Sequence, residues 1–276
     1  MDEDRRDFGQ YSDWLRRAWS VELPLDGLAA SPAYDPGRPF RPVAEELGMA
    51  EEADPGRGLS SDHVTLFMAR TLRREEASIR EREVWEVGCG TGLLSALFAR
   101  LGARRVLATD VDPDALALAR GTARRNGVAV ETAVAGLFHG TPWSEPVDVL
   151  VADLPQKPSD RSGVPLSQDG GPEGTRLLLP FLEESVRWLR PGGKLYFFMH
   201  TLPHPQAIRR LHELYRVRLL AFMRRVFDPG AFAGIVPYLR RRREAGVCHF
   251  HDHDRDRHSF FGMVFEGTRR DRVPAA

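Results

Sequence analysis

The chain has 276 residues, of which 42% are hydrophobic and 28% are charged, and its 39 Lys and Arg residues balance its 39 Asp and Glu residues. This length and composition are typical of a globular protein with a full hydrophobic core, built as one large domain or as a domain with an appendage. A formal net charge of zero and a pI of about 7.2 give no electrostatic reason to expect a polyanionic partner, so nucleic acid is not expected as a partner.

The chain also lacks the patterns of secreted and membrane proteins. Its first residues, MDEDRRDFGQ, are acidic and polar with no apolar run behind them, which is unlike a secretory signal. No window approaches the ~18 consecutive apolar residues of a membrane-spanning helix. The two cysteines, Cys89 and Cys248, are too few and too far apart for a disulfide framework. We therefore expect a cytoplasmic protein with no membrane partner.

The first part of the chain predicts a helical extension. In residues 11–20, tryptophan, leucine and alanine recur at helical spacing. A Pro- and Gly-rich passage follows and predicts extended loop. Residues 60–81 then carry a serine or aspartate cap ahead of a second helical pattern. We interpret residues 1–80 as a helical N-terminal extension or lid, followed by the main domain at 81–276.

From Glu83 onward, short apolar runs alternate with helical patterns. The expected strands are residues 84–89, 104–110, 128–134, 147–153, 194–200, 215–227 and 258–269. The helices expected between them are residues 93–102, 113–127, 174–193 and 231–246. Near-continuous apolar strands that alternate with helices are typical of a parallel sheet covered on both faces. The predicted fold is α/β: a Rossmann-like, mostly parallel seven-stranded sheet with helices on both faces and its site beyond the carboxyl ends of the strands.

The first expected strand runs into a glycine-rich loop, Gly88-Cys89-Gly90-Thr91-Gly92, ahead of a helix. Glycines let the backbone approach a ligand closely, and the amides at the start of the next helix face that ligand. Leu93 stands where a dinucleotide fingerprint would carry its third glycine. Eighteen residues after Gly92 the second strand ends in Asp110, whose carboxylate offers two acceptors for the two hydroxyls of a ribose. Asp112, which precedes a proline, is expected to cap the following helix.

The stretches EVGCGTG and ATDVDPDAL together resemble the class I S-adenosylmethionine-dependent methyltransferases, over about residues 58–200. The resemblance implies an enzyme with S-adenosylmethionine as its cofactor. The residues that would bind it by this resemblance are Glu86, Gly88, Cys89, Gly90, Gly92, Leu93, Asp110, Val111, Leu137 and Asp153. Family members often carry an acid for the adenine amino group near the end of the third strand, where this chain has Gly136-Leu137. Ser61 and His63 belong to a segment that lies over the cofactor in similar enzymes.

The stretch ADLPQKP, residues 152–158, follows the fourth strand, where NPPY or DPPY stands in methyltransferases that act on nitrogen. In those enzymes the first side chain and the next carbonyl accept hydrogens from an NH2 group and direct its lone pair at the methyl group. Residues 169–197 also resemble the glutamine N5-methyltransferases of peptide release factors. The resemblance implies Asp153 and Gln156 as catalytic residues. The residues implied to bind the substrate are Asp153, Leu154, Pro155, Gln156 and His200.

Two departures from this pattern bear on the substrate. Asp153 replaces the asparagine of the glutamine enzymes, and an ionised aspartate only accepts hydrogen bonds, whereas asparagine also donates. A carboxylate therefore suits an amine or guanidine better than a carboxamide, and it can take up the released proton. Gln156 replaces the usual aromatic residue, which argues against a stacked base. The leading hypothesis is N-methylation of an amino or guanidino nitrogen on a small molecule, such as an amino acid or natural-product intermediate.

Several alternatives stay open. The chain resembles enzymes that methylate protein or RNA, and also azetidine-carboxylate synthases that cyclise S-adenosylmethionine and release methylthioadenosine. A non-catalytic cofactor-binding module is compatible with the same fold, and Asp153 before a proline is also typical of a plain turn. The segment 249–258 is rich in His and Asp, but its alternation with arginine between two strands favours a solvated hairpin over a metal site, so no metal is expected. A homo-oligomer is compatible with the sequence.

Overall fold

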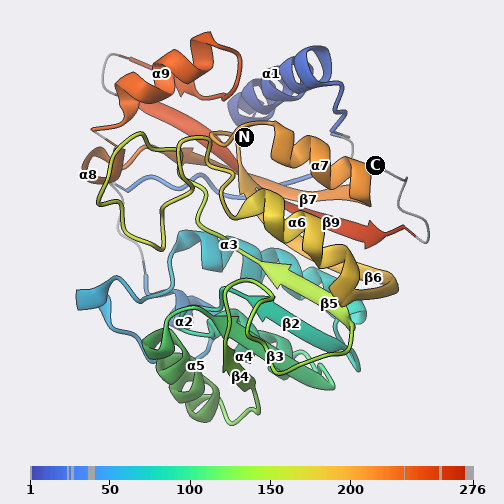
Figure 1. Cartoon of the computed structure of the whole chain (residues 1–276). Coiled ribbons are helices and arrows are strands. Elements are labelled where there is room, and N and C mark those ends of the chain that lie inside the picture. The colour runs from blue at the N-terminus through green and yellow to red at the C-terminus, as the bar shows by residue number, and fades with distance from the viewer. Residues whose placement is uncertain are drawn as a thin grey trace.

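A mostly parallel sheet lies at the centre of the computed structural model, which describes residues 2–23, 25, 28–36, 41–232, 234–254 and 257–270 (Figure 1). Its strands are β1 (Ala29–Ala30), β2 (Glu83–Val87), β3 (Arg105–Asp110), β4 (Glu131–Val134), β5 (Val147–Ala152), β6 (Leu189–His200), β7 (Tyr215–Val226), β8 (His251–Asp252) and β9 (His258–Arg269). They lie in the order β1-β7-β9-β6-β5-β2-β3-β4, and β8 pairs with β9. β9 runs antiparallel to its neighbours, and the other described pairs are parallel.

The predicted fold class is confirmed in the seven main strands. β1 and β8, of two residues each, extend the sheet beyond the prediction. β1 comes from the Pro- and Gly-rich passage, where the sequence predicts only loop. It joins the sheet because Ala29 and Ala30 pair with Ala221 and Phe222 at the edge of β7, and such pairing needs only backbone groups.

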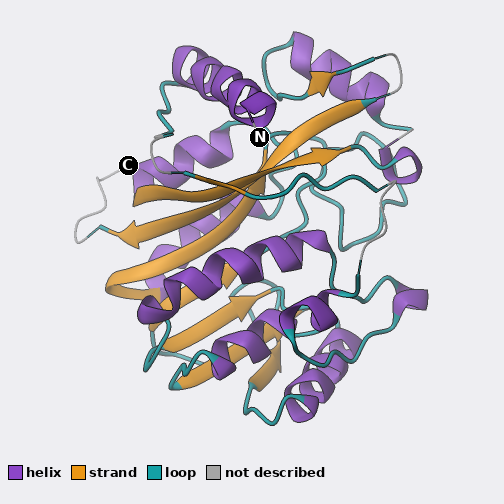
Figure 2. Ribbon diagram, turned by 180° about the vertical axis from the view of Figure 1, so that it is seen from behind, coloured by secondary structure: helices purple, strands orange, loops and turns teal. Residues whose placement is uncertain are grey.

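Helices cover both faces of the sheet (Figures 1 and 2). They are α1 (Asp2–Trp19), α2 (Val43–Leu47), α3 (His63–Leu72), α4 (Leu93–Arg100), α5 (Pro113–Arg125), α6 (Leu178–Trp188), α7 (Gln206–Leu214), α8 (Pro229–Phe232) and α9 (Val236–Glu244), with 3-10 turns η1 (Pro55–Arg57) and η2 (Arg73–Ser78). The apolar sides of α1, α6 and α7 form one core with one face of the sheet. Those of α2, α3 and α4 form a second core with the other face. Both faces of the central strands are therefore buried, which is why their sequences are nearly continuously apolar.

Helix α1 packs on the sheet at β7 and β9. It begins at Asp2, earlier than the predicted 11–20, and its buried side consists of Phe8, Tyr11 and Leu15. The Phe8 ring stacks on Phe222 with the ring centroids 4.2 Å apart. Burying one such aromatic side chain contributes about 1.5–3 kcal/mol to stability. The early start also lets acidic residues of the first turns pair with a buried arginine of β7.

The carboxyl ends of five strands meet at one edge of the sheet. β2, β3, β5 and β6 are mutually parallel, and β7 shares their direction because both β6 and β7 are antiparallel to β9. This edge therefore gathers the glycine loop after β2, Asp110 at the end of β3, Asp153 after β5, His200 at the end of β6 and Arg225 near the end of β7. It is the edge at which open α/β sheets bind ligands.

Candidate active site

The glycine loop after β2 is a tight turn that only glycine accommodates at its key positions. Gly88, Gly90 and Gly92 all have positive φ, of 77°, 52° and 72°. A Cβ on Gly92 would lie 2.6 Å from the Cβ of Ala119 on α5, so the loop is packed closely against that helix. The buried Leu93 then begins α4, whose first amide groups face the edge of the sheet. The loop is thus shaped as the sequence predicts for a ligand cradle.

The carboxylate of Asp110 fixes the loop to the end of β3. Its Oδ2 accepts a hydrogen bond from the Gly90 N–H at 2.9 Å, and its Oδ1 accepts one from the Asp112 N–H at 3.0 Å. Each oxygen keeps a second lone pair, so the carboxylate can still accept the two ribose hydroxyls. Asp112 caps α5 by accepting from the Asp114 N–H at 2.9 Å, as expected, whereas the contact of Asp110 with a ribose stays a prediction.

The apolar residues expected near the adenine flank Asp110. Val111 is 53% exposed and leaves an apolar surface open beside the carboxylate. The Ala135 N–H donates to the Asp110 carbonyl at 3.0 Å and so holds the next turn close to Asp110. In that turn Leu137 adopts a positive φ of 56°, and reciprocal hydrogen bonds between Gly136 and His139 close it. These positions fit an adenosine group without an acidic side chain.

Glu86 lies beneath the glycine loop. It is 4% exposed, and the Ser95 hydroxyl on α4 donates a hydrogen bond to its carboxyl group. Burial raises the pKa of Glu86 to about 8. Cys89 is also buried, and burial raises the pKa of its thiol, which makes it an unreactive packing residue of the loop.

A segment of the N-terminal extension is tied to the glycine loop. Glu51 accepts from the Thr91 hydroxyl at 2.7 Å and from the Ser61 N–H at 2.8 Å. The hydroxyls of Ser61 and Thr91 lie 3.2 Å apart. Ser61 therefore lies beside the glycine loop, and its contact with the cofactor stays a prediction. Glu51 was missed, because a single acid in an acidic, irregular stretch carries no recognisable pattern.

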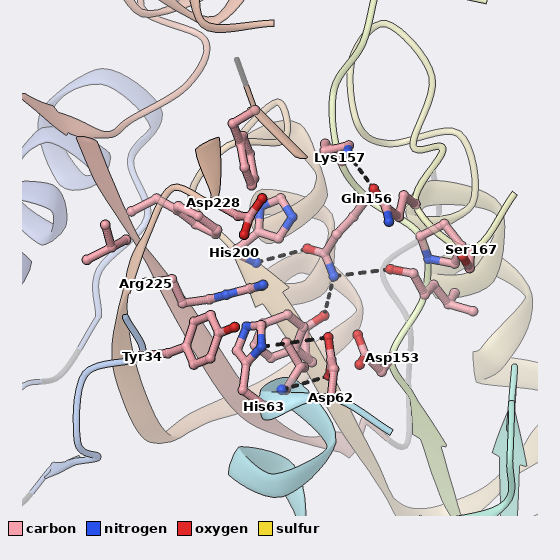
Figure 3. A pocket seen from close by; sticks show the side chains of 18 residues that line it. Tyr34, Asp62, His63, Asp153, Gln156, Lys157, Ser167, His200, Arg225 and Asp228 are labelled. Atoms are coloured by element: carbon pink, nitrogen blue, oxygen red, sulfur yellow. Dashed lines mark hydrogen bonds and ion pairs between the residues drawn. The ribbon is translucent and has the colours of Figure 1, made fainter. Parts of the chain in front are cut away.

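The turn after β5 is anchored by Gln156, whose side chain is buried. Its Nε2 donates to the carbonyls of Leu154 and Phe198, both at 3.2 Å, and its Oε1 accepts from the His200 N–H at 2.9 Å (Figure 3). Leu154 packs against Gly88, where an added Cβ would lie 3.2 Å from its Cδ2. The turn is thus fixed to the glycine loop on one side and to β6 on the other. This geometry favours a positioning role for Gln156.

Asp153 and its neighbours line a pocket of about 380 Å³ at the same edge of the sheet (Figure 3). All five residues expected to bind the substrate belong to its wall: Asp153, Leu154, Pro155, Gln156 and His200. The other lining residues are Tyr34, Asp62, His63, Val64, Lys157, Ser167, Gln168, Phe198, Arg225, Val226, Asp228, Phe232 and Phe260. The pocket therefore combines the β5 turn with the N-terminal extension and the last strands of the sheet.

The N-terminal extension supplies an aromatic wall of the pocket. The Tyr34 N–H donates to the Arg224 carbonyl at 2.9 Å, and the Val226 N–H donates to the Tyr34 carbonyl at 3.0 Å, so Tyr34 is fixed beside the end of β7. Its ring stacks on His63 with the centroids 3.5 Å apart. Burial lowers the pKa of His63 to about 3, and it also places the pKa of His200 well below its usual value. Both histidines are therefore neutral at physiological pH.

The carboxyl group of Asp153 holds its proton in this environment. Its pKa is raised to about 8, chiefly by burial and to a smaller extent by the nearby Asp62, while the guanidinium of Arg225 opposes the shift. At pH 7 most molecules therefore carry a neutral Asp153. A neutral carboxyl group both donates and accepts hydrogen bonds. The raised pKa argues against the ionised side chain on which the sequence-based preference for an amine rested.

The histidine-rich segment forms a hairpin edge. His251 and Asp252 of β8 pair with the start of β9, and His258 Nδ1 lies 2.6 Å from Asp252. In the part of the chain that the structure describes, which leaves out residues 255 and 256 of this segment, no three His, Cys, Asp or Glu side chains converge as a metal site. Among the described helices, none is long and apolar enough to cross a membrane.

Known proteins similar to this chain share the cofactor part of the site. The family model described as ribosomal protein L11 methyltransferase (PrmA) matches residues 60–157, from the segment over the glycine loop to the β5 turn. A relative from Methanocaldococcus jannaschii named "Putative protein N5-glutamine methyltransferase" is 27% identical over 164 residues, which are 57% of this chain and 82% of that protein.

Ribosomal protein L11 methyltransferases are similar over a shorter share of their own length. That of Rhizobium etli is 33% identical over 51% of this chain and 50% of its own, and that of Dechloromonas aromatica is 37% identical over 66% and 47%. The chain thus spans about half the length of these relatives. A solved L11 methylase from Lactobacillus delbrueckii subsp. bulgaricus overlaps with a TM-score of 0.45 at 18% identity, over 90% of this chain and 98% of that one. Over residues 60–157 the chain is thus similar to the class I S-adenosylmethionine-dependent methyltransferases that its motifs resemble, and S-adenosylmethionine is the cofactor of that family.

Proposed function

We propose that this protein transfers a methyl group to a carboxamide nitrogen of a protein side chain, such as that of glutamine. The relative from M. jannaschii is named for this chemistry, and the L11 methyltransferases are named for a protein substrate. The small-molecule substrate that the sequence first suggested has no counterpart among these names. They support the alternative of a macromolecular substrate.

The observation that carries the proposal is the position of Asp153 in the pocket wall beside Leu154, where burial raises the pKa of its carboxyl group. Its raised pKa leaves one O–H donor and one acceptor oxygen at pH 7. An asparagine amide, which stands at this position in the glutamine enzymes that the chain resembles, offers the same pair of functions. The carboxyl group can therefore donate to the carbonyl of a carboxamide and accept from its NH2 group. Replacement of asparagine by aspartate is thus compatible with a carboxamide acceptor.

The residues of the β5 turn would act mainly by positioning. S-adenosylmethionine supplies a methyl group on a positively charged sulfur. A neutral Asp153 that gives a proton to the amide oxygen and takes one from the amide nitrogen concentrates the lone pair on that nitrogen. The carbonyl of Leu154 accepts from Gln156 and keeps one lone pair for the acceptor N–H. The nitrogen–carbon bond forms as the sulfur–carbon bond breaks, and the products are an N-methylcarboxamide, S-adenosylhomocysteine and one proton.

The pocket offers little for a nucleobase. Tyr34 already stacks on His63, and no net positive charge draws the chain to phosphates. Gln156 occupies the position at which base-methylating enzymes carry an aromatic side chain, and its amide is engaged with the backbone. These features favour a protein acceptor over RNA.

The proposal is tested by incubating the protein with S-adenosylmethionine labelled in the methyl group and with cell extract treated separately with protease or nuclease. We expect label in a protease-sensitive fraction, N5-methylglutamine after complete enzymatic digestion, and S-adenosylhomocysteine as the spent cofactor. Label confined to RNA or to small metabolites would overturn the protein assignment. Release of methylthioadenosine without labelled product would instead show cyclisation of the cofactor.

A further inference from the structure

Arg225 is a half-buried cation of the pocket that the proposed transfer does not use. It lies one residue before the end of β7, and its guanidinium lies over the Phe260 ring with 4.9 Å between the Cζ atom and the ring centroid. Figure 3 shows its side chain extending between the Tyr34–His63 pair and His200. The flat guanidinium is thus supported from one side, and its edge faces the pocket.

The guanidinium of Arg225 has no counter-ion within the described part of the chain. Its Nε is buried without a hydrogen-bond partner, and no ion pair joins it to a described residue. The adjacent Arg224, on the same strand, shows the usual arrangement: it pairs with Asp4 and Asp7 and donates to Ser259 at 2.9 Å. Burial lowers the pKa of Arg225, because a buried positive charge without a partner is costly.

The acidic groups that face Arg225 are occupied in other ways. Asp62 caps α3, where its Oδ1 accepts from the Val64 N–H at 2.8 Å and from the Thr65 N–H at 3.1 Å. Asp153 is mostly protonated at pH 7. Asp62 attracts the guanidinium of Arg225 but forms no ion pair with it. The pocket therefore holds a fixed cation whose hydrogen-bonding edge is left for a ligand.

A carboxylate fits this position better than a phosphate. One guanidinium edge binds one carboxylate through two parallel hydrogen bonds and balances its single charge. A dianionic phosphate would meet the acidic side chains of Asp62 and Asp228 in the same pocket. A pocket of about 380 Å³ is at the small end of ligand sites, so the acceptor nitrogen and the carboxylate of the substrate must lie close together.

We propose that Arg225 binds a carboxylate of the substrate. One amino-acid residue of the substrate would then carry both the acceptor nitrogen at Asp153 and the carboxylate at Arg225. The part of this inference that concerns the nitrogen rests on the proposed function, whereas the carboxylate site does not. With the proposed protein substrate, this carboxylate belongs to a C-terminal residue. A free amino acid presents the same chemistry to Arg225, and the last experiment below separates the two sources.

The test compares two small probes of equal size. Glutaramate carries one carboxamide and one carboxylate, and glutaramide carries two carboxamides. Each is titrated calorimetrically into the protein with bound S-adenosylhomocysteine. We expect the wild-type protein to bind glutaramate roughly 10- to 100-fold more tightly, the range of a charge-assisted pair. The ratio should fall close to one in Arg225→Gln and be partly restored in Arg225→Lys. Arg216→Ala, which removes an exposed arginine from the other end of β7, should keep the wild-type ratio.

Three outcomes would overturn the inference. The first is a wild-type protein without a preference for glutaramate, a result that does not depend on the folding of any variant. The second is an Arg225→Gln variant that keeps the preference. The third is an Arg225→Gln variant that binds S-adenosylhomocysteine more weakly and leaves the probe ratio unchanged, which would assign Arg225 to the cofactor. These titrations need no turnover. A protein that prefers glutaramate but shows no methyl transfer would therefore contradict only the proposed reaction. A protein that transfers methyl groups but shows no such preference would contradict only this inference.

The source of the carboxylate is resolved by a second pair of ligands. A peptide that ends in glutamine with a free carboxylate is compared with its C-terminal amide and with free glutamine. Tight binding of the acid peptide and of free glutamine, each lost in Arg225→Gln, supports the site with both sources. Binding of only one of them names the source. Equal binding of the acid and amide peptides, together with no binding of free glutamine, contradicts the carboxylate site at Arg225.

Discussion

The cofactor half of the site and the substrate pocket differ in how their residues are distributed along the chain. The cofactor half is local: Glu86, the glycine loop and Asp110 lie on two consecutive strands and the turns that follow them. The pocket is assembled from residues 34 to 260, which meet only in the folded protein. Local geometry thus determines what the first half binds, whereas burial by distant segments determines the charge states of the second. Substitutions in the two halves should separate cofactor binding from catalysis.

The largest effect is expected from Asp153→Ala. This substitution removes both the donor and the acceptor at the β5 turn, and we expect kcat to fall about 10²- to 10⁴-fold. The Kd for S-adenosylmethionine should change little, because the glycine loop and Asp110 are untouched. Calorimetric titration of the cofactor and a labelled-methyl assay measure the two quantities. A variant with normal turnover would remove Asp153 from the reaction.

Asp110→Ala should give the opposite pattern. Losing two charge-assisted hydrogen bonds to the ribose should raise the Kd for S-adenosylmethionine roughly 10- to 100-fold, with a smaller change in kcat at saturating cofactor. The matched control is Asp112→Ala, two residues away, which removes the cap of α5 and a 3.9 Å ion pair with the exposed Arg57. That control should cost about 1 kcal/mol of stability and leave the Kd unchanged. Equal Kd values for the two variants would show that Asp110 has no special contact with the cofactor.

Gln156→Ala should affect the pocket by an intermediate amount. It frees the turn from β6 and leaves the buried His200 N–H without its acceptor, which should cost about 1–3 kcal/mol in thermal or chemical unfolding. We expect kcat to fall about tenfold through misplacement of Asp153. Gln156→Glu keeps the acceptor for His200 but loses both donors, and it separates the two contributions. A Gln156→Ala variant as inactive as Asp153→Ala would instead indicate direct contact with the substrate.

Glu51→Ala should give the smallest effect. Glu51 links the N-terminal extension to Thr91 of the glycine loop, and its removal should raise the Kd for the cofactor about threefold, within the range of one hydrogen bond. Glu51→Gln, which keeps an acceptor oxygen, should restore the affinity. An unchanged Kd for the alanine variant would mean that the extension does not shape the cofactor site.

The same contrast explains what the sequence predicts and what it does not. The parallel sheet, the glycine loop and the separate roles of Asp110 and Asp112 follow from local pattern, because strand burial, positive φ and helix capping each act over a few residues. The place of Asp153 at the pocket also follows, from its position after a central strand. Its protonation does not, because it depends on burial and on Asp62 and Arg225, which are distant in the chain.

Other features escape prediction for related reasons. Arg225 is one arginine among many, and only the structure distinguishes it from its fully paired neighbour Arg224. Tyr34 reaches the pocket by backbone pairing with β7, which leaves no mark on its own side-chain pattern. The early start of α1 depends in the same way on a distant partner, because its acidic first turns pair with Arg224.

The most direct test of the account is the pH dependence of kcat/KM for the wild-type protein and Asp153→Asn with a glutamine-containing acceptor. A folded pKa of about 8 means that the neutral, competent Asp153 is present below pH 8 and lost above it, so wild-type kcat/KM should decline above about pH 8. The cofactor Kd, measured over the same range, corrects for the titration of Glu86, whose pKa is also about 8. We predict that Asp153→Asn stays active and lacks this decline. An inactive Asp153→Asn, with wild-type kcat/KM rising through pH 8, would show that an ionised Asp153 serves as a base for an amine and would contradict the account.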